Sequence, residues 1–199
     1  MRRMHIELRP LSHMLEVDGA DALLVPVPRN ERPLRGAAGL ADWRLCGALS
    51  TALRDGQLTG ATQELVLMPA RPPFAGPHIV LVGVGPVEQL PGRGVRDAFR
   101  TFLSRLGGLG TARAMLACPE GIDLVQDAEP AMQGCIEGLV SSGGPAELVL
   151  VCPVRDTAAT AIAAQAKSLA SDARRRGVSV SAERVFPERA AHHRPVAHA

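Results

Sequence analysis

Five short apolar runs alternate with amphipathic stretches along this chain, and this alternation constrains the fold more than any other feature. The runs cover residues 21–27, 64–68, 78–84, 112–118 and 147–152. Their length suits strands, and their lack of polar alternation is typical of strands that helices cover on both faces. Residues 4–8 alternate apolar and polar side chains, which predicts one more strand at an edge of the sheet.

Four amphipathic stretches between the runs have apolar residues at helical spacing. They cover residues 40–53, 95–106, 128–139 and 156–177. The first has an apolar face made of Trp43, Cys46, Leu49 and Leu53. Strand–helix–strand alternation with right-handed crossovers predicts an α/β fold, a three-layer αβα sandwich with a mixed, mostly parallel sheet. The second and third runs flank residues 71–77, which predicts a hairpin with a long loop.

The chain length of 199 residues favours one domain, since a chain of this size buries a self-sufficient core. Residues 1–177 carry the alternating pattern and are predicted to form that domain. The pattern weakens beyond Gly177, so residues 178–199 are predicted to be an irregular C-terminal tail.

Composition excludes several classes of protein. The net charge is only +2 and aromatic residues make up 3%, so a dedicated nucleic-acid binder with a base-stacking surface is not expected. No apolar run is long enough to span a membrane, and charges interrupt the segment where a signal peptide needs apolar residues, so we expect a cytoplasmic protein. The four cysteines form no CxxC pair and are expected to be small buried apolar residues.

Two glycine-containing loops are the candidate ligand sites. Gly83, Val84 and Gly85 end a predicted strand, where backbone N–H groups could cradle a phosphate or simply form a turn. Glu88 stands where a dinucleotide-binding fingerprint needs its third glycine, and no Gly-Lys-Ser/Thr sequence of a P-loop occurs.

The second loop follows the third predicted helix and consists of Ser141, Ser142, Gly143 and Gly144. A helix end and turn explains this composition, and an anion-binding nest of backbone N–H groups is the alternative.

Catalytic chemistry is not predicted. The serines lie in helical patterns and not on a strand–turn–helix elbow, and His5, His13 and His78 have no partner nearby in the sequence. His192, His193 and His198 have no carboxylate or cysteine beside them, so we expect no metal and no cofactor.

Arg174, Arg175 and Arg176 end the last predicted helix, where cations suit the helix dipole. They form either a solvated helix end or a contact for nucleic acid or an acidic partner protein.

Several short motifs, in their order and spacing, resemble the N-terminal domain of the leucyl aminopeptidase (cytosol aminopeptidase) family. These are residues 21–27, Gly39 to Asp42, Leu58-Thr59-Gly60, 79–85, Ile136 to Leu139 and the Ala-rich stretch 157–176. The chain departs from the family pattern at Pro86 and at residues 141–145.

The resemblance implies a macro-domain-like αβα fold that helps to assemble hexamers, with the metal-bound active site in a separate C-terminal domain. The family's Asn-Thr-Asp-Ala-Glu-Gly-Arg motif has no counterpart here, so no catalytic residue is transferred. We therefore expect a non-catalytic, stand-alone domain that acts in self-assembly or in binding a partner protein.

Two alternatives remain open. One is a macro-like module that binds ADP-ribose or another nucleotide at its glycine loops, outside the carboxyl ends of the strands. The other is nucleic-acid contact through the Arg-rich C-terminal quarter of the chain.

Overall fold

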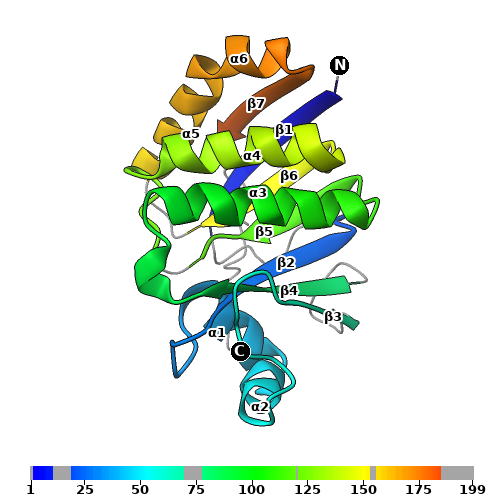
Figure 1. Ribbon diagram of the computed structural model, residues 1–199, viewed down its shortest axis with the longest axis vertical. Coiled ribbons are helices and arrows are strands. Elements are labelled where there is room, and N and C mark those ends of the chain that lie inside the picture. Colours follow the sequence, from blue (N-terminus) through cyan, green and yellow to red (C-terminus); the bar gives the residue numbers. More distant parts are fainter. Residues whose placement is uncertain (1, 11–18, 70–77, 120, 153–155, 185–199) are drawn as a thin grey trace, which may run out of the picture.

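The computed structural model describes residues 2–10, 19–69, 78–119, 121–152 and 156–184, in which a central sheet is covered by helices (Figure 1). The strands are β1 (Arg2–Pro10), β2 (Ala22–Pro28), β3 (Leu65–Pro69), β4 (His78–Gly85), β5 (Arg113–Ala117), β6 (Glu147–Cys152) and β7 (Val178–Arg184). The helices are α1 (Gly36–Arg44), α2 (Ala48–Arg54), α3 (Arg93–Gly108), α4 (Ala128–Ser142), α5 (Asp156–Ser168) and α6 (Ala170–Arg175), with a 3-10 turn, η2, at Val87–Gln89. None of the described helices is long and apolar enough to cross a membrane.

The sheet has the strand order β3-β4-β2-β5-β6-β1-β7. Only β3 runs antiparallel, beside β4, and the other described strand pairs are parallel. This arrangement confirms the predicted mixed, mostly parallel sheet and the pairing of residues 64–68 with residues 78–84. The predicted hairpin loop, residues 71–77, lies outside the described residues.

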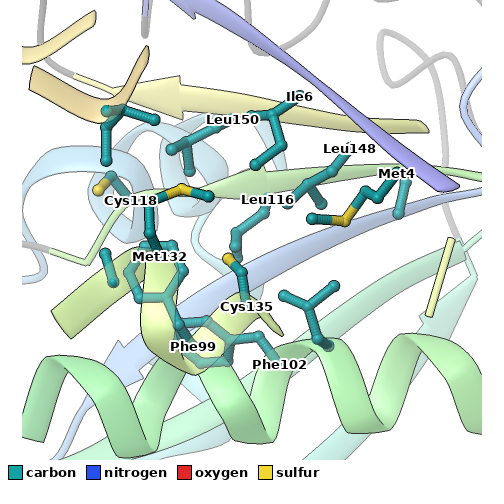
Figure 2. Packing of buried hydrophobic residues seen from close by; sticks show 14 of the residues in the cluster. Met4, Ile6, Phe99, Phe102, Leu116, Cys118, Met132, Cys135, Leu148 and Leu150 are labelled. Carbon is teal, nitrogen blue, oxygen red and sulfur yellow. The ribbon is translucent and has the colours of Figure 1, made fainter. Parts of the chain in front are cut away.

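Two apolar cores lie on opposite faces of the sheet. The larger core packs α3, α4, α5 and α6 against one face, with side chains from β1, β2, β4, β5, β6 and β7. Figure 2 shows Phe99 and Phe102 of α3 pointing toward the strands, beside Met132 and Cys135 of α4. The smaller core packs α1 and α2 against β2, β4, β5 and β6 on the other face. These layers confirm the αβα sandwich.

On the face of the sheet that carries the smaller core, β1 presents polar side chains. The smaller core contains no described residue of β1 or β7. Glu7 and Arg9 lie on this face, and their side chains pair at 2.8 Å. Arg113 of β5 pairs with Glu7 at 3.2 Å and also with Glu147 of β6. Ion pairs therefore stand where the sandwich has no described helix.

The C-terminal boundary of the predicted domain is wrong. Residues Val178–Arg184, expected to begin an irregular tail, form β7, which pairs in parallel with β1. Val178 and Val180 are buried because alternate side chains of this strand face the larger core. The expectation that residues 4–8 form an edge strand is also wrong, since β1 lies between β6 and β7. Residues 185–199 lie outside the described part of the chain.

The first predicted helix is broken, and this changes which side chains are buried. Residues 45–47 separate α1 from α2, with Cys46 and Gly47 at positive φ. Leu49 is buried as predicted, but Trp43 is 68% exposed and its ring is covered by the Arg44 guanidinium at 4.6 Å. Cys46 is exposed as well, so the prediction that every cysteine is buried holds for Cys118 and Cys135 only, and the Cys152 side chain is outside the described atoms.

Candidate functional site

The carboxyl edge of the sheet contains a point where neighbouring parallel strands send their connections to opposite faces. The chain leaves β2 toward α1 on the face of the smaller core and leaves β4 toward α3 on the face of the larger core. Loops 29–35 and 86–92 therefore diverge between β2 and β4. In open α/β sheets, such a divergence is where ligands bind.

Gly83, Val84 and Gly85 lie at this edge, at the end of β4, and the two glycines serve a backbone crossing. The Gly83 N–H donates to the Glu64 carbonyl at 2.8 Å, and the Gly85 N–H donates to the Gly60 carbonyl at 2.9 Å. A Cβ on Gly83 would overlap the Ala61 carbonyl oxygen. Both N–H groups thus already have acceptors within the chain, and Val84 is buried.

Asn30 and Glu88 link the two diverging loops. The Asn30 amide donates to both oxygens of the Glu88 carboxylate, at 3.0 and 2.9 Å, and its own oxygen accepts from the Val87 N–H at 3.2 Å. A backbone hydrogen bond to Glu88, and then the Asn30 amide, lower the pKa of this carboxyl below its ordinary value. The point where the two loops diverge therefore carries an ionised carboxylate, which repels phosphate. Sequence reasoning did not find this link because it joins loops far apart in the chain.

Ser141, Ser142, Gly143 and Gly144 end α4 at the opposite edge of the sheet, just before β6 begins. The serine hydroxyls donate to the Gly138 carbonyl at 3.0 and 2.9 Å, and Gly143 takes the left-handed conformation of a helix end. The Arg2 guanidinium donates to the Leu139 carbonyl at 2.8 Å. Carbonyl oxygens and the negative end of the helix dipole dominate here, and they attract cations.

The two glycine loops therefore do not form one site. Gly85 is level with Pro28 at the carboxyl edge, whereas Glu147, just after the second loop, is level with Arg113 at the amino edge. Since both edges belong to the same parallel strands, the full length of the strands separates the loops.

Arg174, Arg175 and Arg176 end α6 and extend to its C-cap, and all three are exposed. Arg175 and Arg176 each pair with Asp172, at 3.4 Å. The positive charge of Arg176 also acts on Glu137 of α4. The pKa of Glu137 is lowered mainly by its hydrogen bond from Arg96 and further by the charges of Arg176 and Arg100. This end of the helix layer combines cations with nearby carboxylates.

A cluster that the sequence analysis missed joins β1 to β7. The His5 ring lies 3.0 Å from the Ser181 hydroxyl through Nδ1 and 3.0 Å from a Glu183 oxygen through Nε2. The sequence feature that could have indicated this cluster is the alternation of apolar and polar residues over 178–184, which predicts a strand with one polar face. The group is exposed on the sheet surface.

Within the described ranges, no three histidine, cysteine, aspartate or glutamate side chains are arranged to hold a metal ion. Three further histidines, His192, His193 and His198, at which no metal is expected from the sequence, lie outside those ranges.

Two cavities lie on the α3 side of the sheet, near its β3 edge. The first, about 180 Å³, is at the carboxyl end of β4 and includes Gly83 and Val84 in its lining. The second, about 220 Å³, is at the amino end and is lined by Leu67, His78 and Leu109 together with residues 21–22 and 110–111. Leu65 and Leu67 of β3 are 42% and 53% exposed, so the same edge presents apolar side chains to solvent.

Comparison with solved structures shows the fold. Tomato leucine aminopeptidase, as a mutant, matches with a TM-score of 0.58 at 13% identity, covering 83% of this chain and 36% of that one. A macrodomain of Oceanobacillus iheyensis, as a mutant with ADPR, matches with a TM-score of 0.60 at 14% identity, covering 82% and 92%. The Trypanosoma brucei macrodomain in complex with ADP-ribose matches with a TM-score of 0.57 at 21% identity, covering 79% and 68%. The fold is therefore macrodomain-like.

Sequence comparison gives the family. A probable cytosol aminopeptidase of Pseudomonas fluorescens Pf0-1 is 35% identical over 99 residues, which is 50% of this chain and 20% of that protein. The cytosol aminopeptidase of Pseudomonas aeruginosa PAO1 is 33% identical over 96 residues, 48% of this chain and 19% of that protein. The chain thus matches about a fifth of the length of these relatives. Residues 24–142 match the N-terminal domain of the cytosol aminopeptidase family, and the chain belongs to that family through this domain.

Proposed function

We propose that this domain acts by binding another protein chain, and that its first partner is a second copy of itself, paired through β3. The observation that carries the proposal is the state of this strand. Among the described strands, β3 is the last at its side of the sheet; it carries no charged residue and exposes two leucines.

An edge strand of this kind is prone to pair with another strand. Within the part of the chain that the structure describes, no strand pairs with its outward N–H and C=O groups. Natural proteins usually protect such edges with charges, bulges or a covering segment. β3 consists of Leu-Val-Leu-Met-Pro, in which only Pro69, at its end, opposes pairing. A two-fold axis beside Leu67 would pair two copies antiparallel and continue the sheet across the dimer.

The surroundings of β3 add apolar area to this interface. Val66 and Met68 pack toward the smaller core, so Leu65 and Leu67 point to the other face, where Leu67 and Leu109 share the 220 Å³ cavity. Burial of each leucine contributes about 1.5–3 kcal/mol to association at most, before the entropy cost of binding is subtracted. The family's assembly into larger particles, implied by the resemblance, agrees with this role.

Sedimentation equilibrium on the purified full chain tests the proposal. We expect a dimer or larger species, and we expect Leu67→Lys to weaken association at least tenfold because it places a charge on the edge strand. Val140→Lys is the matched control, since Val140 is 41% exposed on α4, away from β3. A wild-type chain that stays monomeric and captures no partner would exclude this function, and equal effects of both variants would place the interface elsewhere.

Nucleotide binding is the second candidate, favoured by the fold match to a macrodomain in complex with ADP-ribose. The Glu88 carboxylate, on the loop that follows β4, opposes it. Calorimetry with ADP-ribose decides the matter: absence of heat at millimolar ligand removes this candidate, whereas binding that strengthens in Glu88→Gln supports it.

Nucleic-acid contact through Arg174, Arg175 and Arg176 is the remaining candidate. Truncation of the chain after Gly177 cannot test it, because β7 would be removed as well. A triple Arg→Gln substitution leaves β7 intact. Binding to DNA or RNA that falls steeply with salt and is lost in this variant would support the contact.

A further inference from the structure

The 180 Å³ cavity between β4 and α3 has the composition of a small-molecule site. Its lining is apolar toward the sheet and polar toward solvent. The apolar part is formed by Val82, Val84, Leu90, Ala98 and Phe102, and the polar part by Thr62, Gln63, Gln89, Asp97 and Thr101. Ligand sites typically combine a mostly apolar wall with a few convergent polar groups.

The helix contributes one continuous face to this cavity. Gly94, Ala98 and Thr101 follow each other at helical spacing in the first turns of α3 and face the end of β4. A Cβ at Gly94 would overlap the Gln89 carbonyl oxygen, so this glycine allows the preceding turn to lie against the helix. The wall is therefore fixed by backbone packing and exists before any ligand binds.

Two glutamine amides on the rim are available for a ligand. Among the described residues, no hydrogen bond of the Gln63 or Gln89 side chain is found, whereas the Thr101 hydroxyl donates to the Asp97 carbonyl at 2.9 Å. Gln63 also has a φ of +69°, a conformation uncommon for a residue with a side chain, and it is held there by the bond from its N–H to the Gly83 carbonyl at 3.0 Å. Unusual backbone of this kind is more frequent at functional sites.

The size and rim together define a class of ligand. An enclosed cavity of about 150 Å³ accommodates benzene, so this one has room for a six-membered ring. A glutamine amide offers a donor and an acceptor side by side and pairs with planar groups that offer the reverse, as it does on base edges. We infer that this cavity binds a single planar six-membered ring that carries an amide or an adjacent amino and keto group.

This inference does not depend on self-association through β3, because a monomer contains the whole cavity. Nicotinamide and cytosine are suitable probes with the donor–acceptor edge, and benzene is the probe that lacks it. A fragment of about nine heavy atoms is expected to bind with a Kd of roughly 1 mM.

Titration of the ¹⁵N-labelled full chain, followed by amide chemical shifts, measures this binding. We expect nicotinamide or cytosine to shift residues 62–63, 82–84 and 89–101, and benzene to bind at least fivefold more weakly. Gln89→Ala should weaken binding of the polar probe at least fivefold, and Ala98→Leu should abolish it by filling the cavity. Ala164→Leu, at an exposed position of α5, is the control for the same substitution elsewhere.

The results of these titrations either support or overturn the proposed site. Saturable shifts confined to the cavity and lost in Ala98→Leu support the site, provided that the amide spectrum of the variant stays dispersed. Shifts elsewhere, no saturation below the solubility of the probes, or equal binding of benzene and nicotinamide would overturn the inference. Equal binding to the wild type and Gln89→Ala would overturn it as well.

Discussion

Gly60, Gly83 and Gly85 lie where residues 58–64 cross the ends of β2 and β4. A Cβ on Gly60 would come within 2.6 Å of the Pro28 carbonyl oxygen, and one on Gly85 within 2.5 Å of the Thr62 hydroxyl. The Glu64 carboxylate holds the crossing segment by accepting from the N–H groups of Thr59 and Gly60, at 2.9 and 2.7 Å. Two motifs that carry the family resemblance, Leu58-Thr59-Gly60 and the end of β4, therefore meet in a backbone contact.

The substitution Gly83→Ala tests this contact. We expect it to lower the free energy of unfolding by about 2–4 kcal/mol, because its Cβ overlaps a backbone oxygen that cannot move alone. Gly108→Ala is the control, since nothing lies within 4 Å of a Cβ at this helical position. That variant should instead gain up to about 1 kcal/mol. Urea unfolding measures both, and a neutral Gly83→Ala would refute the assigned role.

Cys135 of α4 is a thiol enclosed by the larger core, as Figure 2 shows. Burial raises its pKa from an ordinary value of 9.0 to about 12. Its thiol therefore stays protonated in the folded protein at a pH where the unfolded chain already releases the proton. The contribution of this group to stability is complete below pH 9 and is lost as the pH rises from 9 toward 12.

This difference predicts an alkaline loss of stability. The free energy of unfolding should fall by about 1.4 kcal/mol per pH unit across this range on account of Cys135. Unfolding in urea at several pH values, for the wild type and Cys135→Ala, measures the slope. The variant should be less stable at neutral pH but should lose less stability above pH 9, and parallel curves would contradict the prediction.

The helices α3 and α4 lie side by side and parallel, with glycines between them (Figure 1). Gly134 faces Arg96 and Phe99, Gly138 faces Leu103, and Gly107 faces Ser142. Small residues at such a contact let helix backbones approach closely. The Arg96–Glu137 ion pair spans the outer side of the same contact.

Gly138→Ala is expected to destabilise the protein although alanine favours helix. Its Cβ would lie 2.5 Å from the Leu103 Cβ and 2.9 Å from the Arg100 carbonyl oxygen, so the helices must separate. We expect a net loss of about 1–3 kcal/mol, after a gain of about 1 kcal/mol in helix propensity. Thermal unfolding followed by circular dichroism measures it, and an unchanged or higher midpoint would show that the two helices can adjust.

Most elements were predictable because each one is coded locally. The apolar runs gave β2 to β6 within a few residues, and the stripes of α3 and α4 matched their buried faces. The position of β7 was missed although Val178, Val180 and Ala182 alternate with polar residues, because a strand with one covered face gives a weaker signal. Trp43 was misplaced because a break at residues 45–47 turns α2 relative to α1.

The candidate site was much less predictable. The sequence indicated that Gly83 and Gly85 end a strand, but their acceptors, the Asn30–Glu88 link and the cavity behind α3 depend on segments far apart in the chain. Local sequence patterns show which side chains a segment contains. They do not show which distant segment those side chains contact in the folded protein.

The larger core depends on β7. A chain that ends at Gly177 would leave an edge of β1 unpaired and would remove Val178 and Val180 from the core. The two valines alone contribute about 3–6 kcal/mol through burial. This is comparable to the whole stability of many domains.

We therefore expect the chain ending at Gly177 to be unfolded or aggregated. A chain that ends at Arg184 retains β7, and comparison of the two isolates the contribution of this strand. Size-exclusion chromatography and circular dichroism provide the measurement. A cooperative unfolding transition for the shorter chain, at the midpoint of the longer one, would show that the domain ends at residue 177 after all.

The place of β1 in the sheet also bears on how the protein folds during its synthesis. Of the described strands, β1 is the first to be synthesised, and it pairs with β6 and β7, whose residues follow more than a hundred positions later. Native contacts between such distant segments slow folding. Until β6 and β7 emerge, β1 has neither of its neighbours, and its Met4, Ile6 and Leu8 side chains are open to chaperones or to other unfinished chains.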